Sequence, residues 1–305
     1  MTRALNQNRC NIDQPIAETC CICGTSTAQQ PCTDKAQVRC NVREFSHQSF
    51  TVWRCAHCRS LHCLESIDHA QYYANYPLRR QKYDFFARHM FQRRLQFLTE
   101  AGLSEGHTLL DYGCGSGYFV RYARSKGVLA EGYDPYSSEE FGDPSVLNRT
   151  YDFVTSQDVI EHSERPDAFL KTLRQYVKPG GALASGTPNA DRIDLQDPLA
   201  PMDKLHMPYH RHLYTQRELE HAMSADGWQL TLSRRASCFD TRFPFVNSAF
   251  LVRLFRSGGG VMDAGFDPIG PIHMLRHPSL IFWGLLGFWF PRDNDMVVIA
   301  RAPKG

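Results

Sequence analysis

Hydrophobic and polar positions in the middle of the chain alternate between two patterns. Short apolar, aromatic or β-branched runs at 108–110, 151–154 and 182–184 each lead into polar residues, as expected where buried strands reach the edge of a parallel sheet. Between the last two runs, residues 168–177 carry apolar side chains at helical spacing and stop at Lys178-Pro-Gly-Gly181. This alternation of strands and helices predicts an α/β domain.

Glycine recurs at every second position directly after the first of these strands. The strand ends at Asp111, and Gly113, Gly115 and Gly117 follow before a helix begins near Tyr118. Glycine leaves the backbone uncovered, so a ligand can approach it closely at the carboxyl edge of the sheet. The spacing differs from the G-x-G-x-x-G of dinucleotide sites, and no Lys-Ser/Thr follows as in a phosphate-binding loop. The turn therefore predicts a ligand site of another kind.

An acidic residue ends the next predicted strand. Residues 129–133 read as a short strand, and Asp134 follows them directly. In nucleotide-binding α/β folds an acid at this place accepts hydrogen bonds from both hydroxyls of a ribose, because a carboxylate offers acceptors in the right plane. The alternative interpretation is a surface Asp-Pro turn formed with Pro135.

The order of these motifs resembles the class I S-adenosylmethionine-dependent methyltransferases. The motifs follow one another as in the broad bacterial group that acts on small molecules, sugars and quinone-type phenols. In order they are D-x-G-x-G-x-G, the acid after the second strand, Y-D-F-V, E-H, P-D-A-F-L, K-P-G-G and T-P-N. The resemblance covers about residues 106–235 and 294–301. It implies an α/β, Rossmann-like sheet of seven strands whose last strand, 295–301, is antiparallel. Residues 141–150, where the family has an adenine-contacting acid, are abbreviated here.

The resemblance also implies where the cofactor binds. The glycine turn would lie against the methionine part of S-adenosylmethionine, Asp111 near its ammonium group and Asp134 on the ribose. The end of the fourth strand would lie beside the reactive methyl group. The residues predicted to bind the cofactor are Asp111, Gly113, Gly115, Gly117, Asp134, Gln157 and Asp158.

Three histidines are candidates for a catalytic base, because imidazole exchanges a proton near neutral pH. His162 ends a D-x2-E-H run that resembles the E-x2-E-H of ubiquinone-pathway O-methyltransferases, where the run is linked to a divalent metal. Here the first acid is Asp158, and we interpret the run as an orienting element with His162 as a base. His206 and His210 are four positions apart, a spacing that suits one helix face, a base or metal ligands. For each histidine the alternative is a structural, hydrogen-bonded role.

Cysteines form two chelating pairs near the amino terminus. Cys20-x2-Cys23 and Cys55-x2-Cys58 each let two thiolates bind one ion from a single turn, and together they complete a tetrahedral four-sulfur site. A closed site of this kind predicts structural Zn²⁺ in a small zinc-ribbon-like domain over residues 1–68. Redox-active or unliganded cysteines are the alternative. Further residues that could replace one ligand are Cys21, Cys63, His57 and His62. Several bacterial sugar C-methyltransferases, which this arrangement resembles, also carry an amino-terminal zinc module.

Composition restricts the classes of function. The chain has 305 residues, eleven cysteines and a net charge of +2 at pH 7. That charge is too small to argue for a nucleic-acid partner. Residues 1–8 lack the apolar core of an export signal. Many cysteines in such a chain favour metal binding or free thiols in a cytoplasmic protein.

Two segments remain outside these motifs. Residues 69–105 are rich in aromatic and basic side chains, which predicts a helical linker or cap with its aromatic face on the core and its arginines in solvent. Residues 236–293 form an insertion between the sixth and seventh strands of the methyltransferase domain, 106–305. The apolar run 280–290 is too short to span a bilayer. It predicts packing on the core or a partner, a hydrophobic substrate wall or contact with a membrane surface.

The sequence therefore predicts a methyltransferase that acts on a hydroxyl or carbon of a small molecule, a sugar or a secondary metabolite; it does not indicate an oligomeric state. One alternative is a ribosomal or transfer RNA methyltransferase that holds RNA with the zinc module. Against it, Ser-Gln-Asp-Val follows the predicted fourth strand in place of the Asn/Asp-Pro-Pro-Tyr/Phe motif for base flipping. The other alternative is a non-catalytic zinc-ribbon interaction protein whose core binds the cofactor without turnover.

Overall fold

The computed structural model describes residues 19–29, 32, 34–73, 76–137, 139–196, 204–292 and 294–304, so residues 1–18 of the predicted zinc-ribbon domain lie outside the described part. In chain order, the strands are β1 (Lys35–Arg39), β2 (Ser49–Arg54), β3 (Leu61–Cys63), β4 (Thr108–Tyr112), β5 (Leu129–Tyr133), β6 (Tyr151–Gln157), β7 (Val177–Pro188), β8 (His212–Leu213), β9 (Gln229–Arg234) and β10 (Asp295–Arg301). The α-helices are α1 (His69–Tyr73), α2 (Phe85–Glu100), α3 (Tyr118–Arg124), α4 (Glu139–Gly142), α5 (Pro166–Arg174), α6 (Gln216–Ser224), α7 (Ser248–Ser257), α8 (Pro271–Arg276) and α9 (Ser279–Leu286).

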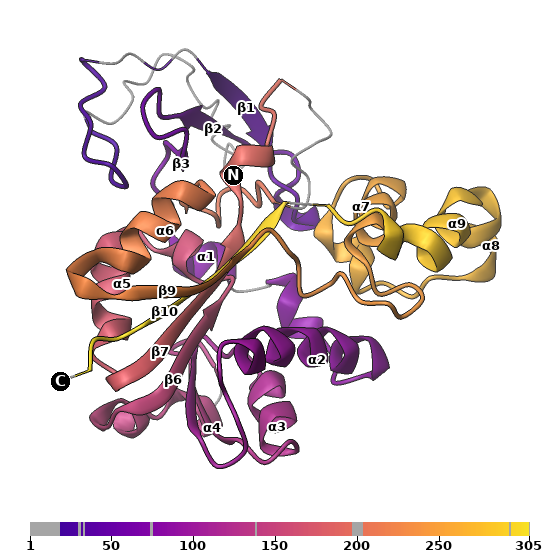
Figure 1. Ribbon diagram of the computed structural model, residues 1–305. Coiled ribbons are helices and arrows are strands. Elements are labelled where there is room, and N and C mark those ends of the chain that lie inside the picture. The colour runs from indigo at the N-terminus through magenta and orange to yellow at the C-terminus, as the bar shows by residue number, and fades with distance from the viewer. Residues whose placement is uncertain are drawn as a thin grey trace, which may run out of the picture.

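The larger sheet has the strand order β5-β4-β6-β7-β10-β9 in the described part of the chain (Figure 1). β4 pairs in parallel with β5 and β6, and β6 with β7, whereas β10 runs antiparallel to both of its neighbours. The predicted antiparallel last strand is therefore confirmed. The predicted count of seven strands is not met, because six are present among the described residues. Among the described residues between β5 and β6, the short chain forms α4 and a 3₁₀ turn at Pro144–Asn148, which leave too few residues for another strand.

Neighbouring residues of each central strand face two different helical layers. Leu109 of β4 lies in the core formed with α2 and α3, whereas Leu110 lies in the core formed with α5 and α6. Successive side chains of a strand point to opposite faces, so one short apolar run fills both cores. Both leucines are fully buried, and full burial of such a side chain contributes about 1.5–3 kcal/mol. The sheet is thus the middle of three layers (Figure 1).

The smaller sheet joins the amino-terminal part of the chain to the methyltransferase part. Its order is β1-β2-β3-β8, with every pairing antiparallel. β8 comes from the segment after β7, and its pairs with β3 are Leu61 with Leu213 and His62 with His212. The core beneath this sheet contains Tyr209 as well as β2 and β3 residues. The amino-terminal strands therefore form one wall of the region beyond the carboxyl edge of the larger sheet.

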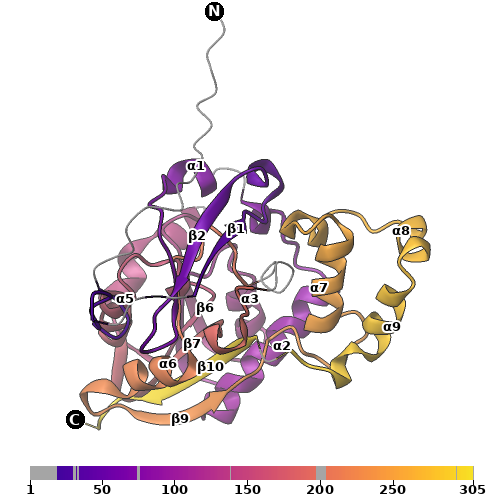
Figure 2. The same cartoon turned by 90° about the horizontal axis from the view of Figure 1, so that it is seen from above.

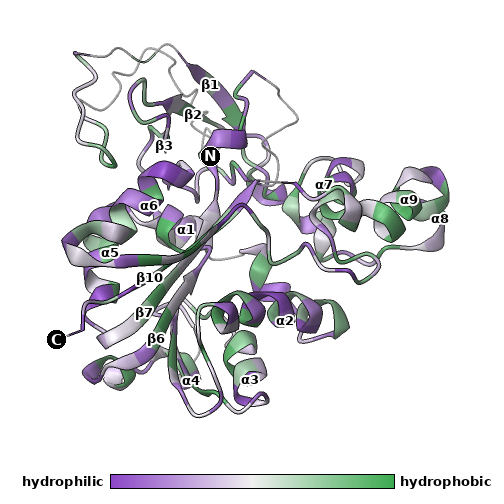
Figure 3. Ribbon diagram, in the orientation of Figure 1, coloured by the Kyte–Doolittle hydropathy of each residue, from purple (hydrophilic) through white to green (hydrophobic). Residues whose placement is uncertain are grey.

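The predicted insertion between strands β9 and β10 forms a helical lobe, residues 236–292, that projects from the body (Figures 1 and 2). Phe250, Leu254 and Leu280 form a small core of its own. Figure 3 shows further hydrophobic residues along α9. Among the described residues, no helix combines the length and the apolar character needed to cross a membrane.

Candidate active site

The glycine turn after β4 is left-handed at three positions. Gly113, Gly115 and Gly117 have φ values of +80°, +55° and +68°, a region that side chains with a Cβ rarely adopt. A Cβ at position 113 would lie 2.4 Å from Val159, and one at 117 would lie 2.0 Å from Phe141. A Cβ at 115 would meet no atom within 4 Å. Packing therefore requires glycine at the two outer positions, whereas Gly115 faces open space that a ligand can use.

Asp134, the predicted ribose ligand, lies directly beneath this turn. Its carboxylate accepts hydrogen bonds from the backbone N–H of Gly115 at 2.9 Å and of Tyr136 at 2.8 Å. The Ser137 hydroxyl donates to the Gly115 carbonyl at 2.6 Å. Each carboxylate oxygen has a second lone pair, so Asp134 can hold the turn and still accept from a ribose.

Asp111 is buried and paired with an arginine of α2. Its carboxylate, 1% exposed, lies 2.5 Å from Nη2 of Arg94, and the guanidinium packs on the ring of Phe119. Burial raises the pKa of Asp111, and the charge of Arg94 opposes that shift. The expectation of solvated arginines in this helix is therefore wrong for Arg94, because a buried carboxylate needs a counter-charge. An ammonium group at this place would share Asp111 with Arg94.

Gln157, the last residue of β6, and Asp158, which follows it, lie at the same edge and are predicted to lie beside the methyl group. Asp158 has φ +55° and donates its N–H to Gly186 of β7 at 2.9 Å. Gln157 Nε2 donates to Asp158 Oδ1 at 3.1 Å. Part of the Asp158 side chain is exposed to solvent. Protein atoms nevertheless crowd its carboxylate, and this desolvation, followed by the charge of Asp295, raises its pKa to about 6.

Glu161 brings a buried carboxylate to two of the candidate histidines. It is 0% exposed, and Oε2 accepts from the Thr187 hydroxyl at 2.9 Å. Oε1 has no hydrogen-bond partner and lies 3.9 Å from Nε2 of His210. Ligand-type atoms of Glu161, His162 and His210 all lie within 4.8 Å of one another. Burial raises the pKa of Glu161 well above its ordinary range, and the charge of Asp158 adds to this.

His162 contacts a tyrosine of α1. The Tyr73 hydroxyl lies 2.8 Å from Nδ1 of His162, and the Tyr73 ring stacks on Tyr136 with centroids 5.9 Å apart. Tyr136 belongs to the loop that Asp134 holds. The aromatic-rich segment 69–105 suggests a cap in which Tyr72, Tyr73 or Tyr83 lines the substrate site, but the sequence does not show which of them reaches His162. The role of Tyr73 depends on where a short helix docks, and no local pattern shows that.

The two other candidate histidines differ in their freedom to react. They lie on either side of a turn at 207–209 rather than on a helix. His206, 1% exposed, has its Nδ1 2.5 Å from Asn41 and its Nε2 3.0 Å from Tyr76, so both ring nitrogens have partners. His210 uses Nδ1 on the Lys204 carbonyl at 2.7 Å, which leaves Nε2 facing Glu161. The geometry thus favours His162 and His210 for chemistry and a structural role for His206.

The four predicted metal-binding cysteines converge in the amino-terminal part. Sγ of Cys20 lies 3.7 Å from that of Cys58, and Sγ of Cys23 lies 3.8 Å from that of Cys55. Tetrahedral zinc with Zn–S bonds near 2.3 Å requires sulfur separations of about 3.8 Å, so the donor set fits this ion. The hydrogen bond between Cys20 and Cys58 lowers the pKa of Cys58 to about 5 and raises that of Cys20.

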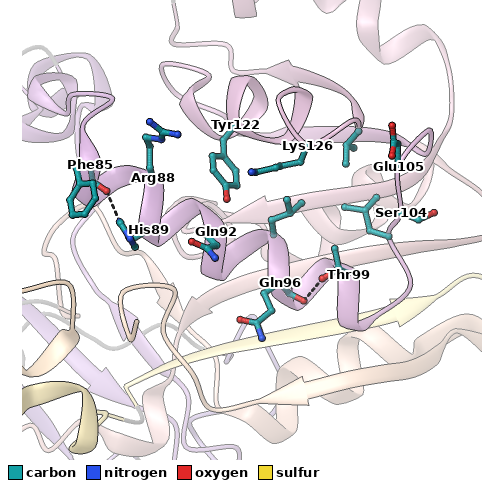
Figure 4. Close-up of a pocket in the computed structure, with 13 residues that line it drawn as sticks. Phe85, Arg88, His89, Gln92, Gln96, Thr99, Ser104, Glu105, Tyr122 and Lys126 are labelled. Atoms are coloured by element: carbon teal, nitrogen blue, oxygen red, sulfur yellow. Dashed lines mark hydrogen bonds between the residues drawn. The ribbon is translucent and has the colours of Figure 1, made fainter. Parts of the chain in front are cut away.

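A cavity of about 580 Å³ lies away from these residues. It opens beside α2 and is bounded by residues 103–105, Tyr122 and Lys126 (Figure 4). It shares no lining residue with the glycine turn or the histidine cluster. The candidate active site is therefore defined by its side chains at the sheet edge and not by this cavity.

The strand order, the glycine turn and the acid beneath it define the class I methyltransferase fold. A family model described as a methyltransferase domain matches residues 83–233. Residues 83–233 are thus similar to methyltransferase domains, in keeping with the class I S-adenosylmethionine-dependent methyltransferases that the sequence motifs resemble.

Among similar curated proteins are two ubiquinone biosynthesis O-methyltransferases. The one from Paraburkholderia xenovorans is 29% identical over 117 residues, covering 32% of this chain and 50% of the relative. The mitochondrial one from Schizosaccharomyces pombe is 32% identical over 124 residues, covering 32% of this chain and 45% of the relative. The chain thus spans about half the length of the curated relatives it matches. A solved methyltransferase complex with the Haloferax volcanii Trm112 activator aligns with TM-score 0.44 and 17% identity, over 71% of this chain and 91% of that one.

Proposed function

We propose that this protein transfers a methyl group from S-adenosylmethionine to a hydroxyl group or an acidic carbon of a small molecule. One observation carries the proposal: the candidate base His162 and the glycine turn lie at one sheet edge and are linked through Tyr73 and Tyr136. The matching segments of the curated relatives belong to proteins named O-methyltransferases, which favours a hydroxyl acceptor.

The residues of the chain supply positioning and proton transfer. S-adenosylmethionine, when bound, supplies an electrophilic methyl group on a sulfonium. Gly115 and Asp134 would hold it, because the open face of the turn admits a ligand and the carboxylate has lone pairs left for a ribose. In the proposed tautomer, His162 donates its Nδ1–H to Tyr73, and Nε2 takes the proton of the acceptor. Ligand-type atoms of Glu161 lie within 4.8 Å of those of His162, close enough for this side chain to orient the imidazole.

Calorimetric titration with S-adenosylmethionine and S-adenosylhomocysteine tests the cofactor half of the proposal. Mass-spectrometric detection of methylated product from a panel of phenols, catechols and sugars tests the acceptor half. We expect micromolar cofactor binding, and product formation that a His162→Gln variant loses while it still binds the cofactor. Folded protein that binds neither compound contradicts the proposal.

We propose further that Cys20, Cys23, Cys55 and Cys58 bind one structural Zn²⁺ in a zinc-ribbon-like domain, residues 1–68. The sulfur separations support this, as does the group of four thiols that the described residues bring within reach of one ion. Such a site is closed to substrate and contributes folding energy. One zinc per chain and a fall in melting temperature on chelation are the expected results.

Several large apolar side chains of the helical lobe are exposed to solvent. In the described part, those between 40% and 76% exposed are Ile269, Ile272, Leu275, Ile281, Phe282, Leu285, Trp289 and Phe290. Residues 269–292 include Arg276 and Arg292 but no acidic residue. Apolar side chains with basic neighbours suit an anionic lipid surface, and we propose that the lobe contacts one.

Co-sedimentation with phosphatidylcholine vesicles, with and without phosphatidylglycerol, tests this contact. We expect retention only on the anionic vesicles, reduced several-fold by a Leu275→Ser, Trp289→Ser double variant. Leu129→Ser is the matched control, since Leu129 is 59% exposed but lies on β5. Equal retention of the double variant and the control contradicts the assignment to the lobe.

A further inference from the structure

A second cluster of metal-binding side chains lies where the amino-terminal strands meet the methyltransferase part. A thiol and two imidazole nitrogens, from Cys21, His62 and His212, all lie within 4.8 Å of one another. Nδ1 of His62 is 3.0 Å from Nδ1 of His212, and Sγ of Cys21 is 3.9 Å from Nδ1 of His62. The three residues come from the first cysteine turn, β3 and β8, so the cluster exists only in the folded chain.

The two ring nitrogens of His62 face different neighbours. Nε2 of His62 lies 3.2 Å from Sγ of Cys20. Nε2 is thus engaged by Cys20, and Nδ1 is the nitrogen that faces both His212 and Cys21. The ring is 2% exposed and lies under Trp53, so the partners of Nδ1 must come from the protein or from a bound ion.

A divalent metal ion would satisfy all three side chains at once. With Zn–N bonds of 2.0–2.1 Å and Zn–S bonds near 2.3 Å, tetrahedral geometry places two nitrogens about 3.3 Å apart and nitrogen and sulfur about 3.6 Å apart. The observed separations of 3.0 and 3.9 Å lie within a few tenths of an ångström of these values. A proton on His212 would satisfy His62 alone and leave Cys21 without a role.

We propose that Cys21, His62 and His212 bind a second divalent transition-metal ion, Zn²⁺ or a similar one. The inference rests on the geometry of these three side chains, which adjoin the proposed four-cysteine site through Cys20. Three protein ligands leave the fourth position open, and Cys21 is exposed to solvent. The site is therefore accessible, in contrast to the closed four-sulfur site.

An ion at this cluster would affect the candidate active site, because His212 lies two residues from His210. His212 begins β8, directly after His210 and Arg211. The backbone N–H of Arg211 donates to the Glu161 carbonyl at 2.6 Å. The backbone carbonyl of Arg211 accepts from the N–H of Cys63 at 2.9 Å. An ion on His212 would clamp this segment to β3 and so hold His210 against Glu161. Loss of the ion is expected to loosen the catalytic cluster without opening the four-cysteine site.

Cobalt titration of the metal-free full-length chain tests the second site. Co²⁺ on four thiolates gives intense sulfur-to-metal and d–d absorption, and a site with one thiolate gives weaker, shifted bands. We expect wild-type protein to bind two equivalents in two spectral phases. Cys21→Ser and His212→Gln are expected to bind one equivalent with the tetrathiolate spectrum, which also reports that they are folded. Cys32→Ser is the matched control: this half-buried cysteine packs near the four-cysteine cluster but belongs to neither site.

The outcomes separate the two proposals. One equivalent in wild type, with the tetrathiolate spectrum, overturns the second site and leaves the first intact. No binding at all overturns both. Two equivalents in Cys21→Ser and His212→Gln show that other ligands hold the second ion and overturn the assignment to this cluster.

Discussion

Replacing Gly115 by alanine separates the cost of backbone strain from the loss of a ligand contact. The left-handed conformation, φ +55°, costs a residue with a Cβ about 1–2 kcal/mol. The added Cβ meets no protein atom within 4 Å, so no packing cost adds to this. A change of 1 kcal/mol shifts the melting temperature by about 2–4 °C in a domain of this size. We therefore expect a modest fall in stability. Cofactor affinity should fall at least tenfold, about 1.4 kcal/mol, since the methyl group occupies the space assigned to the ligand.

Gly106→Ala is the matched control for this experiment. Gly106 has φ +81° and open space around its Cβ position, but it lies in the loop before β4, at the opposite edge of the sheet from the glycine turn. Thermal unfolding should show similar losses in both variants. Calorimetric titration with S-adenosylhomocysteine should show a weakened Kd in Gly115→Ala only. Equal affinities in the two variants would refute the placement of the cofactor over Gly115.

Three further predictions concern the supporting side chains. Tyr73→Phe removes the hydrogen bond to His162 and should lower kcat about tenfold or more with an unchanged cofactor Kd, measured by steady-state kinetics and calorimetry. Arg94→Met leaves the carboxylate of Asp111 buried without its counter-charge and should cost about 3–5 kcal/mol in urea unfolding; a second change, Asp111→Asn, should restore much of that loss. Burial alone would raise the pKa of Asp152, but hydrogen bonds with a threonine of β4 and a lysine of β7 lower it to about 2. Ionised Asp152 therefore stabilises the fold above pH 4, and this contribution is lost as the pH falls towards 2. Asp152→Asn should be roughly 1 kcal/mol less stable than wild type at pH 7, allowing for partial exposure, and the two unfolding free energies should converge near pH 2.

The cofactor half of the molecule could be predicted because its signals are local. The strand, Asp111 and the glycine turn are contiguous in sequence, and positive φ angles at Gly113 and Gly117 agree with the residue type. The strand count shows the limit of this reasoning. The shortness of 141–150 was visible in the sequence, yet the family pattern still suggested seven strands. A strand needs several extended residues, and Pro144–Asn148 forms a 3₁₀ turn in their place.

Long-range pairings account for what the sequence did not reveal. Arg94 reads as one of several arginines on an amphipathic helix, and only the packing of α2 on β4 shows that it faces Asp111. The spacing of His206 and His210 suggests a helix face. However, Pro208 between them disfavours helical backbone at the preceding residue, and the segment forms turns.

This division explains why the cofactor class can be read from the chain more readily than the acceptor. The cofactor region is built from consecutive elements, β4 to β6, whose order is common to the fold class. The proposed acceptor side is assembled from α1, the loop after β6 and the segment before β8, and β8 in turn pairs with the amino-terminal strand β3. On this proposal, the side chains that face the acceptor depend on how the cysteine-rich part docks. Any change of metal state there is expected to alter acceptor turnover more than cofactor binding. Parallel measurement of kcat and cofactor Kd in the metal-replete and metal-depleted chain would show whether the two halves respond separately.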